Sequence, residues 1–262
     1  MYEGTINKLF SHLNNPIQYF TEFNGEFIEM NQLLGKKIAI NHTGYECFNC
    51  KKNKKIRSFG FCFDCFLKVP QAGDYILRPE LSKAHLNIQD RDLDYEKKVQ
   101  LQPHIVYLAN SSSLKVGVTR ESQIPTRWID QGANFAIPFA RTENRYLAGI
   151  IEVELKKYLS DKTNWRKMLS GKADFIDLIA EKESLKNILP DDLKEYYLEN
   201  NEVLEINYPV LKYPIKFNSI SLQKTHEFEG ILNGIKGQYL IFEDLVFNWR
   251  SHEGYRIDLE IR

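Results

Sequence analysis

The sequence lacks the features that mark secreted, membrane or strongly charged proteins. Its 262 residues hold 35 lysine and arginine residues and 35 aspartate and glutamate residues, so the formal net charge is zero. Any affinity for nucleic acid must therefore come from a local patch, because the whole molecule has no field of one sign. No apolar stretch approaches the length that is needed to cross a bilayer.

The opening stretch also lacks a recognisable targeting signal. MYEGTINKLFSHLNNPIQ has neither the basic end nor the apolar run of a secretory signal, so we expect a cytoplasmic protein with no membrane partner. The apolar content of 43% is ordinary for a globular protein, which excludes global disorder. We find no internal repeat.

Cysteine is rare, and all of it lies in one short stretch, CFNCKKNKKIRSFGFCFDC. Cys47, Cys50, Cys62 and Cys65 form two C-x2-C pairs separated by eleven residues. A reducing cytosol disfavours disulfides, and two such pairs can close four thiolates around one tetrahedral ion. We therefore predict a structural zinc ribbon, with no coordination position left open for catalysis. Two unlinked pairs of reduced cysteines would leave the clustering unexplained.

A basic loop lies between the two cysteine pairs, followed by phenylalanines at 59, 61 and 63. Phosphate backbones and unstacked bases favour such a combination, which makes the loop a candidate nucleic-acid contact. A solvated hairpin tip is an equal alternative for the cations, and packing in the ribbon's small core is the better reading for the rings. The candidate contacts are Lys51, Lys52, Lys54, Lys55 and Arg57.

Hydrophobic patterning predicts an α+β protein. Apolar residues alternate as in strands near both ends of the chain, whereas NRYLAGIIEVELKKYL has the spacing of an amphipathic helix. The C-terminal strands suggest a small barrel or sandwich that the N-terminal strands could complete. The expected segments are an N-terminal β segment (1–45), the ribbon (46–68), a connector (69–102), an α/β domain with a helical extension (103–200) and a C-terminal β domain (201–262).

The stretch VYLANSSSLKVGVTRESQIPTRW, residues 106–128, carries the most functional information. It reads as two strands joined by a polar turn and followed by a helix near 122–131, and ANFAIPFART adds a third strand with its proline near a sheet edge. Tyr107, Gly117 and Arg127 fall at equal ten-residue steps along these elements. Neighbouring antiparallel strands would bring the first two side by side.

This stretch resembles the core of the GIY-YIG nuclease superfamily, in the phage-type variant that reads VY and then KIG. The likeness covers residues 104–165. The whole chain also resembles an uncharacterised bacterial family that combines a zinc ribbon, this core, DKTNWRKML and a C-terminal GIKGQYLIF.

The superfamily resemblance implies a three-stranded antiparallel sheet with flanking helices and a site for phosphodiester hydrolysis. It implies that Tyr107 is the strand tyrosine, that Gly117 gives the backbone close access to substrate, and that Arg127 is the helix arginine. Lys115 takes the position that holds tyrosine in other members. Glu152 corresponds to the metal-binding glutamate, so Mg²⁺ or Mn²⁺ is an expected cofactor.

Each of these residues also has an ordinary structural explanation. Tyr107 could be a strand aromatic, Arg127 a surface ion-pair residue, and Gly117 a bulge or close-packing site. On a helical wheel Glu154 falls inside the apolar stripe and Glu152 at its edge, which favours Glu152 as the ligand at a pocket rim. Asn164 is better explained as a helix cap than as a site residue.

Two functions of different class follow. The first is a nucleic-acid-binding protein that uses its core as a metal-dependent nuclease, with Lys236 and Arg250 of the C-terminal β domain as further candidate contacts. The second is a non-catalytic zinc-ribbon adaptor that binds RNA, DNA or a protein partner, because a fold can persist after catalysis is lost.

Overall fold

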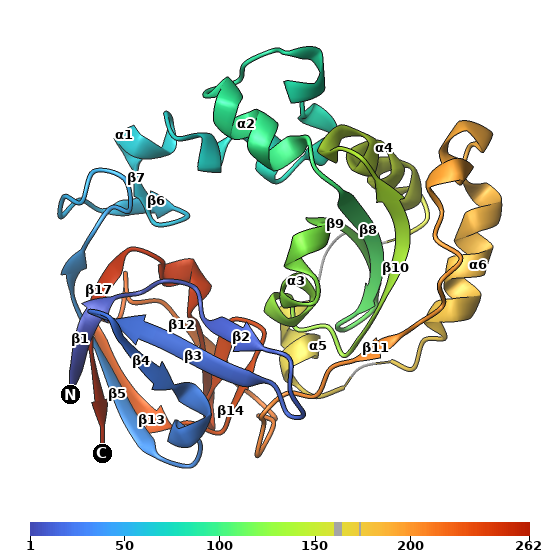
Figure 1. Cartoon of the computed structure of the whole chain (residues 1–262). Coiled ribbons are helices and arrows are strands. Elements are labelled where there is room, and N and C mark those ends of the chain that lie inside the picture. Colours follow the sequence, from blue (N-terminus) through green and yellow to red (C-terminus); the bar gives the residue numbers. More distant parts are fainter. Residues whose placement is uncertain (160–163, 173) are drawn as a thin grey trace. The chain divides into compact units, whose positions relative to one another are not determined.

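The computed structural model describes residues 1–159, 164–172 and 174–262. It has a mixed α+β architecture in which nearly all strand pairs are antiparallel (Figure 1). The first three residues of the DKTNWRKML stretch, 161–163, lie outside the described part. The chain forms two compact units, which are described separately. Unit 1 comprises Met1–Lys68, Leu169–Gly171 and Asn207–Arg262, and unit 2 comprises Val69–Met168 and Lys172–Ile206.

Unit 1 combines the two ends of the chain in one four-stranded sheet. The first strand pairs antiparallel with the last, and Tyr2 lies opposite Leu259. The N-terminal strands thus complete the C-terminal β unit, as expected. Alternate residues of the last strand are buried, including Ile257 and Leu259, because one face of the sheet packs on the core. The order is β1 (Tyr2–Thr5), β17 (Tyr255–Ile261), β5 (Lys37–Tyr45) and β13 (Glu227–Ile231).

Two smaller sheets and the cysteine-rich hairpin make up the rest of unit 1. Trp249 and Phe247 are fully buried there, and the Trp249 indole donates a hydrogen bond to the Asn7 carbonyl at 2.7 Å. One sheet has the order β12 (Asn218–Ile220), β16 (Leu245–Asn248), β15 (Tyr239–Ile241), β14 (Gly234–Lys236), and the other β2 (Phe10–His12), β3 (Gln18–Phe23), β4 (Glu26–Glu29). The hairpin consists of β6 (Ile56–Ser58), β7 (Phe61–Cys62) and the short helix α1 (Phe63–Phe66).

Unit 2 is built on a four-stranded antiparallel sheet. Its second strand from the outside, β8, is buried along its whole length because it has a paired strand on each side and helices over the sheet. Pro138 was expected near a sheet edge; it lies in β10 (Phe135–Thr142), and the pairing of β10 with the short outermost strand β11 (Leu204–Glu205) reaches Phe135 and Ala136 but not Pro138. A bulge between Pro138 and Ala140 accommodates the missing donor. The order is β11 (Leu204–Glu205), β10 (Phe135–Thr142), β8 (His104–Asn110) and β9 (Leu114–Arg120).

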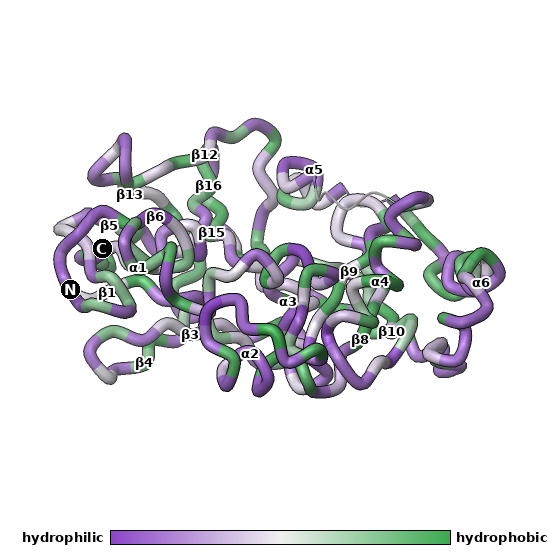
Figure 2. Tube along the Cα trace, turned by 90° about the horizontal axis from the view of Figure 1, so that it is seen from above, coloured by the Kyte–Doolittle hydropathy of each residue, from purple (hydrophilic) through white to green (hydrophobic). Residues whose placement is uncertain are grey.

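Two helices of unit 2, α4 (Arg145–Lys156) and α6 (Leu178–Ile188), pack on the strands of this sheet. Asn144 caps the longest helix by accepting a hydrogen bond from the Leu147 amide at 3.0 Å, and Asn164 caps another helix by accepting from the Lys167 amide at 3.1 Å. The expected cap at Asn164 is therefore confirmed. Figure 2 shows hydrophobic stretches in the sheet and α4, and hydrophilic ones along α2. The helices are α2 (Leu93–Gln100), α3 (Thr126–Asp130), α4 (Arg145–Lys156), α5 (Trp165–Leu169) and α6 (Leu178–Ile188).

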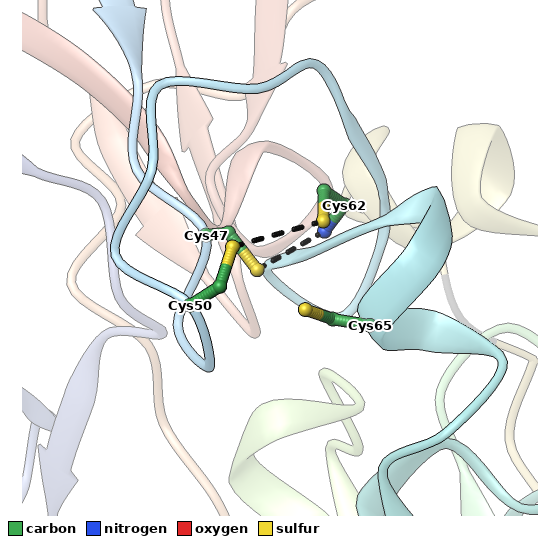
Figure 3. A group of neighbouring side chains, drawn as sticks. All are labelled: Cys47, Cys50, Cys62 and Cys65. Carbon is green, nitrogen blue, oxygen red and sulfur yellow. Dashed lines mark hydrogen bonds between the residues drawn. The ribbon is translucent and has the colours of Figure 1, made fainter.

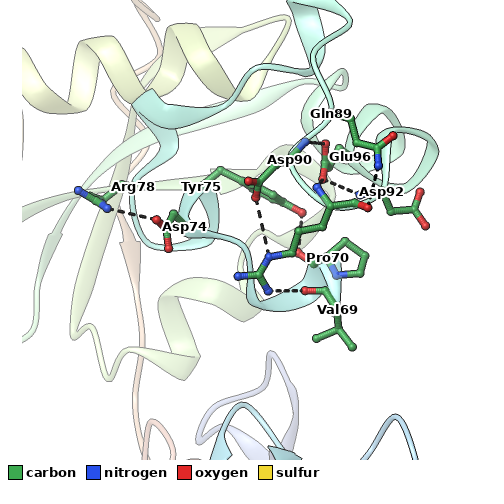
Figure 4. Close-up of polar contacts among 10 residues, drawn as sticks. Val69, Pro70, Asp74, Tyr75, Arg78, Gln89, Asp90, Asp92 and Glu96 are labelled. Carbon is green, nitrogen blue, oxygen red and sulfur yellow. Dashed lines mark hydrogen bonds and ion pairs between the residues drawn. The ribbon is translucent and has the colours of Figure 1, made fainter. Parts of the chain in front are cut away.

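The segment 69–102, expected to be a connector, is folded into short 3-10 turns and helix α2. The Glu96 carboxylate is 1% exposed and accepts hydrogen bonds from three successive amides, those of Asp90, Arg91 and Asp92 (Figure 4). Buried carboxylates are stable only when paired or hydrogen-bonded, so these bonds hold the segment in one shape. No helix in the described part of the chain is long and apolar enough to span a membrane.

Another part of this segment covers α4. The turn Pro79–Leu81 packs so closely on the helix that a Cβ atom at Gly149 would overlap the backbone of Glu80. The Arg145 guanidinium donates to the carbonyls of Tyr75 and Ile76 at 3.0 and 2.9 Å. The segment is thus part of the packing around the first turns of α4.

Candidate metal centre and candidate catalytic site

The four cysteines converge at the cysteine-rich hairpin (Figure 3). Their Sγ atoms all lie within 4.8 Å of one another, and those of Cys50 and Cys62 are 4.0 Å apart. Zinc–sulfur bonds of about 2.3 Å in a tetrahedron separate the sulfurs by about 3.8 Å. The cysteines are therefore positioned to bind one metal ion, and the cluster is compatible with a zinc ribbon.

The surroundings of the cluster favour a thiolate at Cys47, whereas burial raises the pKa of the Cys62 thiol to about 11. The Cys62 amide donates to the Cys47 Sγ at 3.3 Å, and the Asn49 side chain donates to the Cys65 Sγ at 3.3 Å. Burial raises the pKa of Cys47, but hydrogen bonds from the backbone at Cys50, Cys62 and Asn49 outweigh it and lower this pKa to about 6. Thiolates are the form that ligates a metal ion. All four ligands are sulfur, so such a site is closed and structural.

The basic loop beside the cluster is exposed along its length. Two of its cations are engaged in ion pairs, Lys51 with Glu46 at 3.4 Å and Lys54 with Asp64 at 2.7 Å. No ion pair within the described residues involves the other three, which are Lys52, Lys55 and Arg57. These three are the members of the predicted set that are available to a phosphate.

The three phenylalanines of the hairpin differ in their surroundings. Phe61 is 8% exposed and packs edge-on against Phe48, and Phe59 stacks on Phe66 with centroids 6.2 Å apart. Packing in the ribbon core thus accounts for these two rings. Phe63 is 59% exposed and lies on the surface.

Tyr107 and Gly117 lie directly opposite each other in the β8–β9 ladder. A Cβ atom at Gly117 would lie 2.6 Å from the Tyr107 hydroxyl oxygen and 2.7 Å from its Cζ. Because β9 is the outermost strand of the sheet, the phenol crosses Gly117 towards this edge. Glycine is therefore required here for close packing against Tyr107.

The Tyr107 hydroxyl is fully buried and makes no hydrogen bond of normal geometry to any residue that the structure describes. Burial raises the pKa of Tyr107; the charge of Arg127 opposes this rise and that of Glu152 adds to it. The three groups thus lie within reach of one another's charges. The Trp128 ring packs beside the phenol, with centroids 5.9 Å apart.

Arg127 and Lys115 supply positive charge on the Tyr107 side of the sheet. Arg127 lies in α3, is partly buried, and forms no ion pair among the described residues. Lys115 lies two residues before Gly117 in β9, so both point to one face. Lys115 is 5% exposed, and burial together with the charge of Arg127 lowers its pKa to about 7.

Glu152 and Glu154 exchange the environments expected from the helical wheel. Glu152 is 7% exposed and pairs with Lys156 at 3.2 Å, whereas Glu154 is partly exposed and pairs with Lys157 at 2.5 Å. The prediction that Glu154 lies in the apolar stripe was wrong, because the buried face of α4 follows residues 148, 151, 152 and 155. Burial raises the pKa of Glu152, and Lys156 and Arg145 oppose this rise.

The five core residues predicted from the sequence thus lie in one region of unit 2, but they do not line an open cleft. Tyr107, Lys115 and Glu152 are all less than 9% exposed, and Gly117 is covered by the phenol ring. Arg127 is the most accessible of the polar members. Substrate access to the others would need a local movement of the covering residues.

Two features of the polar interior were missed or misread. Lys236 was a candidate surface contact, but it is 1% exposed and its ammonium lies over the rings of Tyr208 and Tyr213 at 5.2 and 5.8 Å. Its burial excludes it as a surface contact for phosphate and lowers the pKa of Lys236 to about 8. Arg250 is partly buried. Arg145 belongs to no motif and was not predicted as a site residue, but it interacts electrostatically with both Arg127 and Glu152.

Comparison with known proteins yields one match. A family model described as "Protein of unknown function (DUF2797)" matches residues 35–257, which is most of the chain. No curated protein and no solved structure matches the sequence.

Proposed function

The chain belongs to the DUF2797 family. We propose that it binds nucleic acid and hydrolyses phosphodiester bonds with a divalent cation at a GIY-YIG-like centre. The centre comprises Tyr107, Lys115, Gly117, Arg127 and Glu152. The exposed cations of the ribbon, Lys52, Lys55 and Arg57, would help to hold the strand.

One observation carries this proposal. The Tyr107 phenol crosses Gly117 to the outer edge of the sheet, where it interacts electrostatically with Arg127 on α3 and Glu152 on α4. A phenol, a guanidinium and a carboxylate from three separate elements are the groups that the resemblance to the nuclease superfamily implies.

The side chains have complementary roles in such a reaction. The Arg127 guanidinium matches the paired oxygens of a phosphate and stabilises charge that grows as water adds to phosphorus. With its raised pKa, Tyr107 stays protonated at neutral pH and would donate a hydrogen bond to the reacting phosphate. Lys115, with a pKa of about 7, is better matched to accept the proton that the attacking water releases.

The carboxylate of Glu152 would be the ligand that the proposed centre contributes to a divalent cation. Mg²⁺ commonly binds through one or two carboxylates, with water and substrate phosphate as the other ligands. Such a cation polarises the phosphate and stabilises the leaving oxygen. Glu152 would have to exchange its ion pair with Lys156 for the metal.

A specific observation favours the second function, a non-catalytic adaptor. The Tyr107 hydroxyl is fully buried, and Glu152 already has a cationic partner. In this case the central unit would be a scaffold, and binding to nucleic acid or to a protein would depend on the exposed ribbon loop.

Cleavage and binding assays on the same preparation separate the two functions. Plasmid, single-stranded DNA and tRNA are incubated with the zinc-loaded protein and Mg²⁺ or Mn²⁺, with Arg127→Ala as the test variant and Arg141→Ala as the control. Cleavage that Arg127→Ala slows by about 100-fold, and that the control retains, supports the nuclease. Salt-sensitive binding without cleavage supports the adaptor.

A further inference from the structure

Two arginines that the proposed site does not use lie at one end of the sheet in unit 2. The first residue of β8, His104, pairs with Arg120 at the end of β9 on one side and with Thr142 at the end of β10 on the other. Arg145 follows three residues after Thr142, at the first position of α4. The topology therefore gathers both guanidinium groups around the start of β8.

Arg120 is available for a ligand. It is partly exposed, and across the described ranges no ion pair or hydrogen bond engages its side chain. By contrast, Arg141 at the same end of the sheet is held by Glu121 at 2.8 Å. An arginine without an acidic partner beside another arginine is a position where an anion would be stabilised.

The charges around Arg145 are mostly positive. Arg127 and Arg120 both lie within electrostatic reach of its guanidinium, and Glu152 is the carboxylate that opposes them. His104 adds no charge at neutral pH, because burial lowers its pKa to about 4. The Arg145 guanidinium is thus close to two other guanidinium groups and to one carboxylate, and that carboxylate also pairs with Lys156. This is a local patch of positive charge on a chain whose net charge is zero.

We propose that Arg120 and Arg145 form a second phosphate position, which holds a phosphate of the same polynucleotide next to the one at Arg127. The inference rests on the proposed function and adds to it that the substrate is a polymer with at least two phosphates across the site. Arg145 is fixed by the carbonyls of Tyr75 and Ile76, so it presents a preorganised charge. Arg120 is partly exposed, and its guanidinium would be held in place by the bound phosphate.

The test compares Arg120→Gln with Arg141→Gln. Both variants remove one guanidinium from the same end of the sheet, but Arg141 lies on the other face and is neutralised by Glu121. Arg145→Gln is unsuitable, because it would also release the Asp74–Ile76 turn. Fluorescence anisotropy of labelled single-stranded DNA and RNA of one sequence is measured over a range of salt, with no added divalent cation.

For Arg120→Gln we expect about five- to tenfold weaker binding at low salt and a salt slope smaller by about 0.7 to 1. Arg141→Gln should match the wild type in both. If the wild type binds and Arg120→Gln is indistinguishable from Arg141→Gln, the second phosphate position is disproved while the proposed function stands. If the wild type binds neither strand at any salt concentration, the proposed function fails, and the inference fails with it.

Discussion

The Tyr107 hydroxyl occupies the space that any side chain at Gly117 would need, since it lies 2.6 Å from the ideal Cβ position. The two residues are partners in the β8–β9 ladder, so neither can move away without breaking strand pairing. Their complementarity fixes the direction of the phenol and thereby its relationship to Arg127 and Glu152.

Gly117→Ala should destabilise the protein by about 1–3 kcal/mol, because the added methyl group overpacks a buried site. Chemical denaturation measures the loss. In the background of Tyr107→Ala the same substitution should cost much less, since the atoms that it meets are gone. Equal costs in both backgrounds would show that Tyr107 is not the residue that requires glycine.

The cysteine cluster predicts one zinc ion per chain. Elemental analysis of protein purified without added metal should find it, and Cys62→Ser should lose it together with the fold of the hairpin, because binding energy for such sites is folding energy. Ser58→Ala, in the same hairpin, is the control. Metal-free protein that is as stable as the zinc-loaded protein would contradict a structural zinc site.

His104 predicts a loss of stability in acid. Its pKa is lowered by burial from 6.5 to about 4, so the unfolded chain binds a proton more tightly than the folded one. The resulting stabilisation is fully present above pH 6.5 and is lost as the pH falls towards 4; it is on the order of 3 kcal/mol. The stability difference between wild type and His104→Gln, measured by denaturant at pH 7.5 and pH 4.5, should shrink accordingly. A constant difference would mean that His104 is not held neutral.

Lys115 predicts the pH dependence of cleavage. As the proton acceptor it must be neutral, so activity should rise with pH with a midpoint near 7 and level off about one pH unit above it. Lys115→Arg, which stays protonated, should be inactive at every pH in this range. Should the pH profile of Lys115→Met keep the wild-type midpoint, another group accepts the proton.

The sequence predicted the elements that have strong local signals. Two C-x2-C pairs can close around only one point, and the alternation in IVYLA and LKVGVT, with a polar turn between, indicates a hairpin in which Tyr107 meets Gly117. The capping role of Asn164 follows from residue type and position alone.

Features that depend on distant segments could not be predicted. The Pro79–Leu81 turn buries the side of α4 that carries Gly149 and Glu152. A helical wheel shows only the residues of the helix, so it could not predict this burial. Lys236 reads as a surface cation, yet two tyrosines far from it in sequence enclose it. Arg145 has no recognisable motif, and its place near Arg120 comes from sheet topology.

Glu152 and Glu154 provide the most direct test of a metal-dependent centre, because they lie in one helix and differ in burial and partner. Cleavage of single-stranded DNA with Mn²⁺ is measured for Glu152→Gln and Glu154→Gln, both checked for folding by circular dichroism. We expect a loss on the order of 100-fold for Glu152→Gln and wild-type rates for Glu154→Gln. Equal rates for the two folded variants, or no cleavage by the wild type, would contradict the proposed centre.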